Sequence, residues 1–236
     1  QANPFLKKYL IQNTIWWIEY LGIDGIREDT YPYCNQYAMA DWNKSILDEY
    51  PNFNIVGEIW TGEPAYLAAY QQKNKFGVHL DTQLPCVTDF ALSDAFRNYL
   101  SGKKGLEGIF NTLAQDFLYY DPNNLLTFFD NHDISRGLFV ANNDVEKYEI
   151  ALTILLTTRG IPKIFYGSEI GIVGEEHHGT IRSPFPGGFE NDSLDAFLSC
   201  DRTDYQNDIF NFTQNLLELR KNHKSLSEGK LTHFYP

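Results

Sequence analysis

Apolar residues recur at helical spacing in several parts of the chain. Residues 4–21 place apolar side chains on one face, and Gly22 is expected to end that helix. Further along, apolar residues stand three, four, seven and eleven positions after Leu106, which predicts a second helix. Further helices are predicted over 37–49, 145–158 and 205–222.

Short apolar runs lie between these helices. They are continuous rather than alternating, which is typical of strands covered on both faces. The segment 171–204 has no period, is rich in Gly, Pro, His and Asp, and is long enough to suggest a functional loop. Alternating helices and strands predict an α/β fold with a parallel sheet and right-handed crossovers. The predicted strands are 25–27, 53–59, 84–90, 125–129 and 162–166.

Composition narrows the class of protein. The 236 residues correspond to one large domain or two small ones, and 43% hydrophobic content argues against disorder. With 31 acidic and 19 basic residues the net charge is −12, which disfavours nucleic acid and anionic membranes as partners. No apolar run reaches the roughly 18 residues of a membrane span. The aromatic content of 15% suits either a packed core or the stacking of sugars.

Cysteine usage and the N-terminus say little about the compartment. Cys34, Cys86 and Cys200 are too few and too scattered for a disulfide framework, and their spacing fits no zinc site. The first ten residues lack the basic-then-apolar pattern of a signal peptide. The expected location is periplasmic or extracellular if a leader was removed, and cytoplasmic otherwise.

Acidic residues stand at the carboxyl ends of three predicted strands. Glu28 and Asp29 follow the first, Glu58 lies near the end of the second, and Asp130 and Asp133 follow the fourth. Active sites of barrels and open parallel sheets are built at that edge. Solvation of surface carboxylates alone does not explain three such endings.

Two of these carboxyl groups have different expected surroundings. Arg27, two residues before Asp29, is a charge partner that favours an ionised carboxylate. Glu58 is flanked by the apolar Ile59 and Trp60, where desolvation favours a retained proton. One ionised and one protonated carboxylic acid form the pair that glycoside hydrolysis requires.

Four segments together resemble signature regions of the α-amylase family of glycoside hydrolases. They occur in the family's order, and the combination is far more specific than any one of them. The likeness is greatest to the neopullulanase/cyclomaltodextrinase branch, through residues 50–58, 181–183 and 186–188, although Thr30-Tyr31-Pro32-Tyr33 replaces the Lys-His pair of many amylases. The four segments are Gly25-Ile26-Arg27-Glu28-Asp29, Gly57-Glu58-Ile59-Trp60, Phe129-Asp130-Asn131-His132-Asp133 and residues 160–169, the last similar to the family's eighth strand.

The resemblance assigns three catalytic roles. By it, Asp29 is the nucleophile, Glu58 the general acid/base, and Asp133 a third carboxylate that holds sugar hydroxyls and stabilises the transition state. The residues alone leave Asp130, Asp133 and Glu28 open for the third role. Glu28 is set aside because neighbouring side chains on a strand point to opposite faces.

Four further residues are expected to bind substrate. The resemblance places Arg27 beside the nucleophile and His132 on the sugar in the cleaved subsite. Trp60 is expected to be a sugar platform, with core packing as the alternative. Arg182 is expected to contact a glucose next to the cleaved bond, with a solvated loop cation as the alternative.

The resemblance also implies a larger enzyme. Residues 1–226 are expected to be the C-terminal part of a catalytic (β/α)8 TIM barrel, about strands four to eight, and 227–236 the truncated start of a C-terminal β-sandwich domain. The implied reaction is double displacement on α-glucans such as maltodextrin, cyclomaltodextrin or pullulan. No cofactor is assigned, and calcium is possible in the intact enzyme. The oligomeric state is left open.

Two other classes of function are weighed. Asp130, His132 and Asp133 could bind the metal of a metal-dependent hydrolase, and His177-His178 is a weaker metal cue that is better explained as loop residues. The chain could also be a non-catalytic scaffold that binds sugar or a partner protein.

Overall fold

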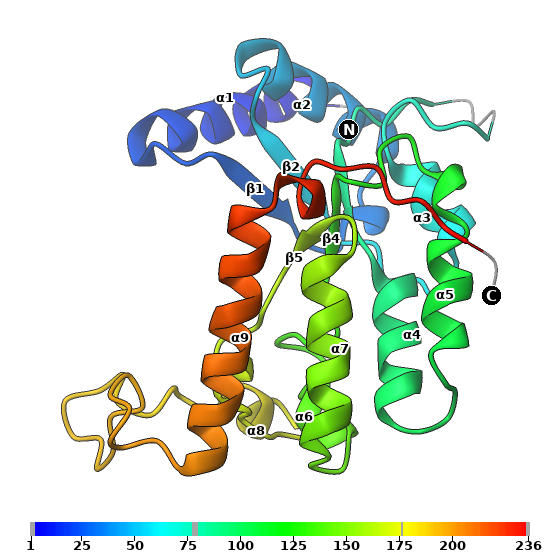
Figure 1. Cartoon of the computed structure of the whole chain (residues 1–236). Coiled ribbons are helices and arrows are strands. Elements are labelled where there is room, and N and C mark those ends of the chain that lie inside the picture. Colours follow the sequence, from blue (N-terminus) through cyan, green and yellow to red (C-terminus); the bar gives the residue numbers. More distant parts are fainter. Residues whose placement is uncertain (1–2, 77–79, 176, 235–236) are drawn as a thin grey trace. The chain divides into compact units, whose positions relative to one another are not determined.

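A computed structural model describes residues 3–76, 80–175 and 177–234 (Figure 1). The chain divides into two compact units. The first comprises Gln1–Ala91 and Ala114–Leu126, and the second comprises Leu92–Leu113 and Thr127–Pro236.

The first unit is built on parallel strands in chain order. Gly25 is paired with Asn54 between β1 and β2, Val56 with Cys86 between β2 and β3, and Val87 with Leu125 between β3 and β4. The predicted parallel sheet is confirmed. The elements of this unit are α1 (Pro4–Leu21), β1 (Gly25–Glu28), η1 (Tyr31–Tyr33), α2 (Gln36–Glu49), β2 (Asn54–Gly57), α3 (Pro64–Tyr70), β3 (Cys86–Thr88), η2 (Asp116–Leu118) and the first two residues of β4 (Leu125–Thr127).

Local capping explains where the first helices begin and end. The Asn3 side chain accepts hydrogen bonds from the backbone N–H groups of Phe5 and Leu6, and Asn35 does the same for Ala38 at the start of α2. Gly22 closes α1 in a left-handed conformation with φ of 62°, as predicted from the sequence.

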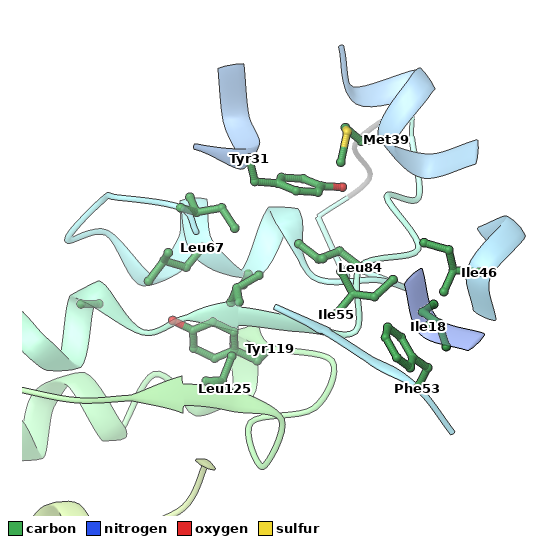
Figure 2. Packing of buried hydrophobic residues seen from close by; sticks show 14 residues of the cluster. Ile18, Tyr31, Met39, Ile46, Phe53, Ile55, Leu67, Leu84, Tyr119 and Leu125 are labelled. Atoms are coloured by element: carbon green, nitrogen blue, oxygen red, sulfur yellow. The ribbon is translucent and has the colours of Figure 1, made fainter. Parts of the chain in front are cut away.

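The core of the first unit lies between the strands and their helices (Figure 2). Ile55 on β2 and Leu125 on β4 are fully buried, as is Leu67 on α3. Gly57 ends β2 at a point of close packing, because a Cβ there would lie 2.6 Å from the Leu84 side chain. A glycine at this point lets the Leu84 side chain pack directly against the end of β2.

The second unit is mainly helical. Lys163 N–H donates to the Thr127 carbonyl, so β5 follows β4 and the strand order is that of the sequence. Helices α7 and α9 lie side by side (Figure 1). Its elements are the rest of β4, most of α4 (Phe90–Leu100), α5 (Glu107–Leu113), α6 (Gly137–Val140), α7 (Val145–Thr157), β5 (Ile161–Pro162), η3 (Ser168–Ile170), α8 (His178–Ile181), α9 (Asp204–Asn222) and η4 (Lys224–Leu226).

Several element boundaries differ from the sequence prediction. The run 84–90 is not one strand, because only Cys86–Thr88 pair and Phe90 already begins α4. Helix α3 was not predicted, since its seven residues are too few to show a period. The strands β2, β4 and β5 are shorter than their apolar runs, and Phe128 and Phe129 are buried beyond the last residue of β4.

The division into a barrel part (1–226) and the start of a β-domain (227–236) stays a prediction. Residues 227–234 contain no strand, and the last two residues lie outside the described chain. Among the described residues, no helix is long and apolar enough to cross a membrane.

Candidate active site

Asp29 lies directly after β1, and its carboxylate is in contact with Arg27. The Arg27 Nη1 donates to Asp29 Oδ1 at 2.9 Å. The Asp29 side chain is 67% exposed, so its other oxygen is open to solvent or to a ligand. The role of nucleophile for Asp29 stays a prediction.

Glu58 lies directly after β2 and is buried, with 7% of its side chain exposed. Its Oε1 accepts from Arg27 Nη2 at 2.5 Å, and its Oε2 accepts from the Thr30 backbone N–H at 3.0 Å. The burial was predicted, but the surroundings are less apolar than the flanking residues suggested. Arg27 is a partner of both carboxylates, not of Asp29 alone.

The Thr30 backbone is strained where it meets Glu58. Its φ of 48° and ψ of 36° place a β-branched residue in the left-handed region. This conformation accompanies the hydrogen bond from the Thr30 N–H to Glu58. Sequence reasoning noted Thr30 only as a departure from the family's Lys-His pattern.

Trp60 lies on the surface, two residues after Glu58. It is 57% exposed, and its ring stacks on Phe90 with a centroid separation of 4.8 Å and an interplanar angle of 16°. Of the two expectations for Trp60, core packing is excluded by its exposure. Trp60 lines a cavity of about 310 Å³ together with Pro32, Ile59, Thr61, Tyr66, Ala69 and Tyr70.

Glu28 faces different surroundings. It lines a cavity of about 320 Å³ with Leu10 of α1 and Met39 of α2, and neither Arg27 nor Asp29 lines that cavity. Burial raises the pKa of Glu28, and the neighbouring Asp29 charge raises it further. The alternation along β1 therefore separates Glu28 from the other two side chains, as expected.

In the second unit, three of the predicted residues come together. Asp133 Oδ2 lies 3.0 Å from His132 Nε2, and Asp133 Oδ1 accepts from Arg182 Nη2 at 2.7 Å. Arg182 Nε also donates to the His132 carbonyl at 2.8 Å. Arg182 is thus a partner of Asp133, from 49 residues away in the sequence, and its contact with substrate stays a prediction.

Asp130 and Asp133 contact different groups. It is fully buried and accepts from the Gly137 N–H at 2.9 Å and from the Ser168 hydroxyl at 3.0 Å. Burial raises its pKa, although these hydrogen bonds and the charge of Arg136 act in the opposite direction. Among residues 3–76, 80–175 and 177–234, no three His, Cys, Asp or Glu side chains converge as a metal site would need. His177 instead caps the one-turn helix α8.

Two buried polar residues near these strand ends were missed by sequence reasoning. Asp89 directly follows β3, inside a run that had been assigned to a strand. Arg136 follows Asp133 by three positions and has no exposed surface. The only sequence signal for Arg136 was its position between Asp133 and the apolar stretch 138–141.

The chain matches known proteins over nearly all of its length. The profile described as "Alpha amylase, catalytic domain" matches residues 1–229. A cyclomaltodextrinase of Thermoanaerobacter pseudethanolicus is 25% identical across 99% of this chain and 37% of its own length. A cyclomaltodextrin glucanotransferase of Geobacillus stearothermophilus is 33% identical across 73% of this chain and 23% of its own length.

Solved structures agree with these relatives. An Anoxybacillus α-amylase, 29% identical, superposes with a TM-score of 0.78 over 97% of this chain and 46% of its own. The chain therefore spans less than half the length of the proteins that it matches here. The predicted fold class, part of a (β/α)8 barrel, is confirmed by this likeness and by the parallel strands in chain order. The match across residues 1–229 shows that the chain belongs to the α-amylase family of glycoside hydrolases.

Proposed function

We propose that the protein is a retaining glycoside hydrolase that cleaves α-glucosidic bonds in starch-derived glucans. The observation that carries this proposal is the single guanidinium of Arg27, which hydrogen-bonds both Asp29 and Glu58 at the ends of adjacent strands. Two carboxyl groups fixed side by side on one cation, one exposed and one buried, suit the two different roles of a double displacement.

In the first step, Asp29 attacks the anomeric carbon of the sugar. The bond from its carboxylate oxygen to that carbon forms while the glycosidic bond breaks, and Glu58 gives its proton to the leaving oxygen. In the second step, Glu58 takes a proton from water as the water oxygen attacks the same carbon, and Asp29 is released. A sugar hydroxyl in place of water gives transglycosylation.

The substrates that we propose are maltodextrin, cyclomaltodextrin or pullulan. Relatives named cyclomaltodextrinase and cyclomaltodextrin glucanotransferase support cyclomaltodextrin as a substrate. Asp133, His132 and Arg182 are proposed to bind hydroxyl groups of the sugar on the cleaved side, because together they offer one carboxylate and two donors within one cluster. The exposed ring of Trp60 is proposed as a stacking surface for sugar.

The experiment that tests the proposal separates the two steps in the complete protein. Glu58→Ala removes the acid, so hydrolysis of natural glucans is expected to stop. A glucosyl fluoride needs no protonation of its leaving group, so its first step is expected to survive, and azide is expected to rescue the second step. Equal loss on both substrates would give Glu58 a structural role and overturn the assignment.

The stereochemistry of the product is a second readout. Two displacements at one carbon give net retention, so proton NMR of the first product is expected to show the α-anomer. A β-anomer would refute the double displacement while leaving glucan hydrolysis intact.

A further inference from the structure

A fully buried arginine lies close to Asp133 and has no role in the reaction described above. The Arg136 guanidinium has no exposed surface, and its central carbon lies 4.0 Å from the centroid of the Phe165 ring. Burial lowers its pKa from the ordinary value of arginine. A buried guanidinium is costly to desolvate, and its hydrogen bonds must offset that cost.

The carbonyls that Arg136 binds all belong to the chain between β5 and Arg182, which we name the 166–181 segment (residues 166–175 and 177–181 as described). Arg136 Nη1 donates to the Tyr166 carbonyl at 2.6 Å, and Nε donates to the Ile181 carbonyl at 2.9 Å. The Arg136 backbone N–H donates to the Gly174 carbonyl at 2.9 Å. One residue therefore holds the beginning, the middle and the end of the segment.

Arg182 is the residue that follows this anchored end. Its side chain turns back to Asp133 Oδ1 at 2.7 Å and to the His132 carbonyl at 2.8 Å. Arg136 itself stands three residues after Asp133. Arg136 therefore fixes the carbonyl of Ile181, the residue before Arg182. The position of the Arg182 backbone, from which its side chain reaches Asp133, depends on that hydrogen bond.

A second buried group, Asp130, also holds this segment. Asp130, the acidic residue that faces Arg136, accepts from the Ser168 hydroxyl at 3.0 Å. The Tyr148 hydroxyl of α7 donates to the Ser168 carbonyl at 2.8 Å. The charge of Arg136 is thus balanced where it is buried, and the segment is tied to a helix of the core as well.

We propose that Arg136 is a positioning residue that holds the 166–181 segment so that Arg182 reaches Asp133. The proposal rests on the proposed function in one respect, namely that Asp133 and Arg182 bind the sugar. A lysine cannot replace Arg136, because one ammonium group lacks the planar fork that reaches the Tyr166 and Ile181 carbonyls in two directions.

The test is a double-mutant cycle in the complete protein. Arg136→Lys is expected to lower kcat/KM for maltodextrin about tenfold or more, since small misplacements of binding groups have effects of this size. In an Arg182→Met background the same change is expected to lower it less than twofold, because the side chain through which Arg136 acts is gone. Equal effects in the two backgrounds, or no effect in either, would overturn the proposal.

Arg220→Lys is a matched control. The Arg220 guanidinium also binds three backbone carbonyls in the same unit, those of Leu156, Thr158 and Gly160, but none belongs to the 166–181 segment. Its replacement is expected to lower the melting temperature and to leave kcat/KM for maltodextrin within twofold. A loss of kcat/KM as large as that of Arg136→Lys would reduce the role of Arg136 to general stability and overturn the proposal.

Amide hydrogen exchange tests the anchoring without any assay of activity. The N–H groups of Ile181 and Arg182 donate to the carbonyls of His177 and His178, so their exchange reports the end of the segment. Exchange there is expected to rise at least tenfold in Arg136→Lys and to stay unchanged in Arg220→Lys. Unchanged exchange in Arg136→Lys overturns the proposal whatever the enzyme does, whereas faster exchange in a protein inactive on α-glucans would sink only the proposed function.

A milder variant covers the case in which Arg136→Lys does not fold. Ser168→Ala removes the hydroxyl that Asp130 accepts and loosens the same segment. It is expected to lower kcat/KM about threefold when Arg182 is present and not at all in the Arg182→Met background, a loss smaller than that of a misplaced binding group. A threefold loss in both backgrounds would contradict the positioning role.

Discussion

Replacing Arg27 by methionine removes the one side chain that binds both proposed catalytic carboxylates. The change keeps most of the apolar stem and deletes the guanidinium. Glu58 then stays buried with only the Thr30 N–H as a described partner, and Asp29 loses its contact with a cation. Both stability and turnover are expected to fall.

The size of the stability loss follows from the exposure of each partner. Breaking a buried ion pair by removing one member costs about 3–5 kcal/mol, because the other charge is left unpaired. The Arg27 side chain is 34% exposed, so water replaces part of what it supplied to Glu58, and about 2–3 kcal/mol remains. The Asp29 side chain is 67% exposed, and its pair adds about 0–1 kcal/mol. The expected loss is about 2–4 kcal/mol.

The assay is urea unfolding of the complete protein beside maltodextrin kinetics. Arg27→Lys is the control, because it keeps the charge but cannot hydrogen-bond two carboxylates with a planar fork, and an intermediate loss is expected. For Arg27→Met we expect kcat to fall about a hundredfold or more, as when one preorganised donor is removed from an active site. A free energy of unfolding within about 0.5 kcal/mol of the wild type, a margin typical of uninvolved surface positions, with kcat within threefold would refute the reasoning.

Three other predictions follow from the same geometry. Asp29→Asn is expected to lower kcat by several orders of magnitude with KM largely kept, because charge is removed and shape is not; near-normal hydrolysis would contradict this. Burial and the charge of Asp29 raise the pKa of Glu28 in the folded protein. The folding stability that its protonated form contributes is therefore fully present below about pH 4.5, and it is lost as the pH rises through the folded-state pKa. Glu28→Gln is therefore expected to raise the melting temperature by about 1–3 °C at pH 7.5 and not at pH 4, and an equal shift at both values would oppose it. Gly57→Ala, whose Cβ would meet Leu84, is expected to cost about 1–3 kcal/mol in urea unfolding, unlike Gly108→Ala, where the nearest atom, Lys104 Cδ, lies at an ordinary contact distance of 3.6 Å.

The sequence predicted the long helices well, because each has a period or a cap that acts locally. Helix α1 has Gly22 at its end, and α9 begins at Thr203 with a capping box. The short elements were harder. The prediction of one strand over 84–90 gave too little weight to Asp89, a polar residue of a type favoured at helix N-termini, which stands directly before α4.

The contacts of the candidate site could not be predicted from the sequence, and the roles of its residues stay predictions. The carboxyl ends of strands in a parallel sheet meet at one edge, and this rule singled out Asp29 and Glu58 in the sequence. That Arg27 binds both depends on side-chain directions across the β1–β2 pair, which a single sequence does not contain. Arg136 was missed for a similar reason, since its partners stand 30 to 45 positions away.

At Thr30, directed evolution for heat resistance and directed evolution for turnover are expected to select different residues. A β-branched residue in the left-handed region stores about 1–2 kcal/mol, which Thr30→Gly would release. A screen for thermal survival is therefore expected to enrich glycine at this position. Glycine also makes the backbone at position 30 more flexible, so the N–H that donates to Glu58 is held less firmly. A screen for glucan turnover is therefore expected to reject the same glycine. The residue found at position 30 would thus indicate whether a protein has been selected for stability, which favours glycine, or for turnover, which favours threonine.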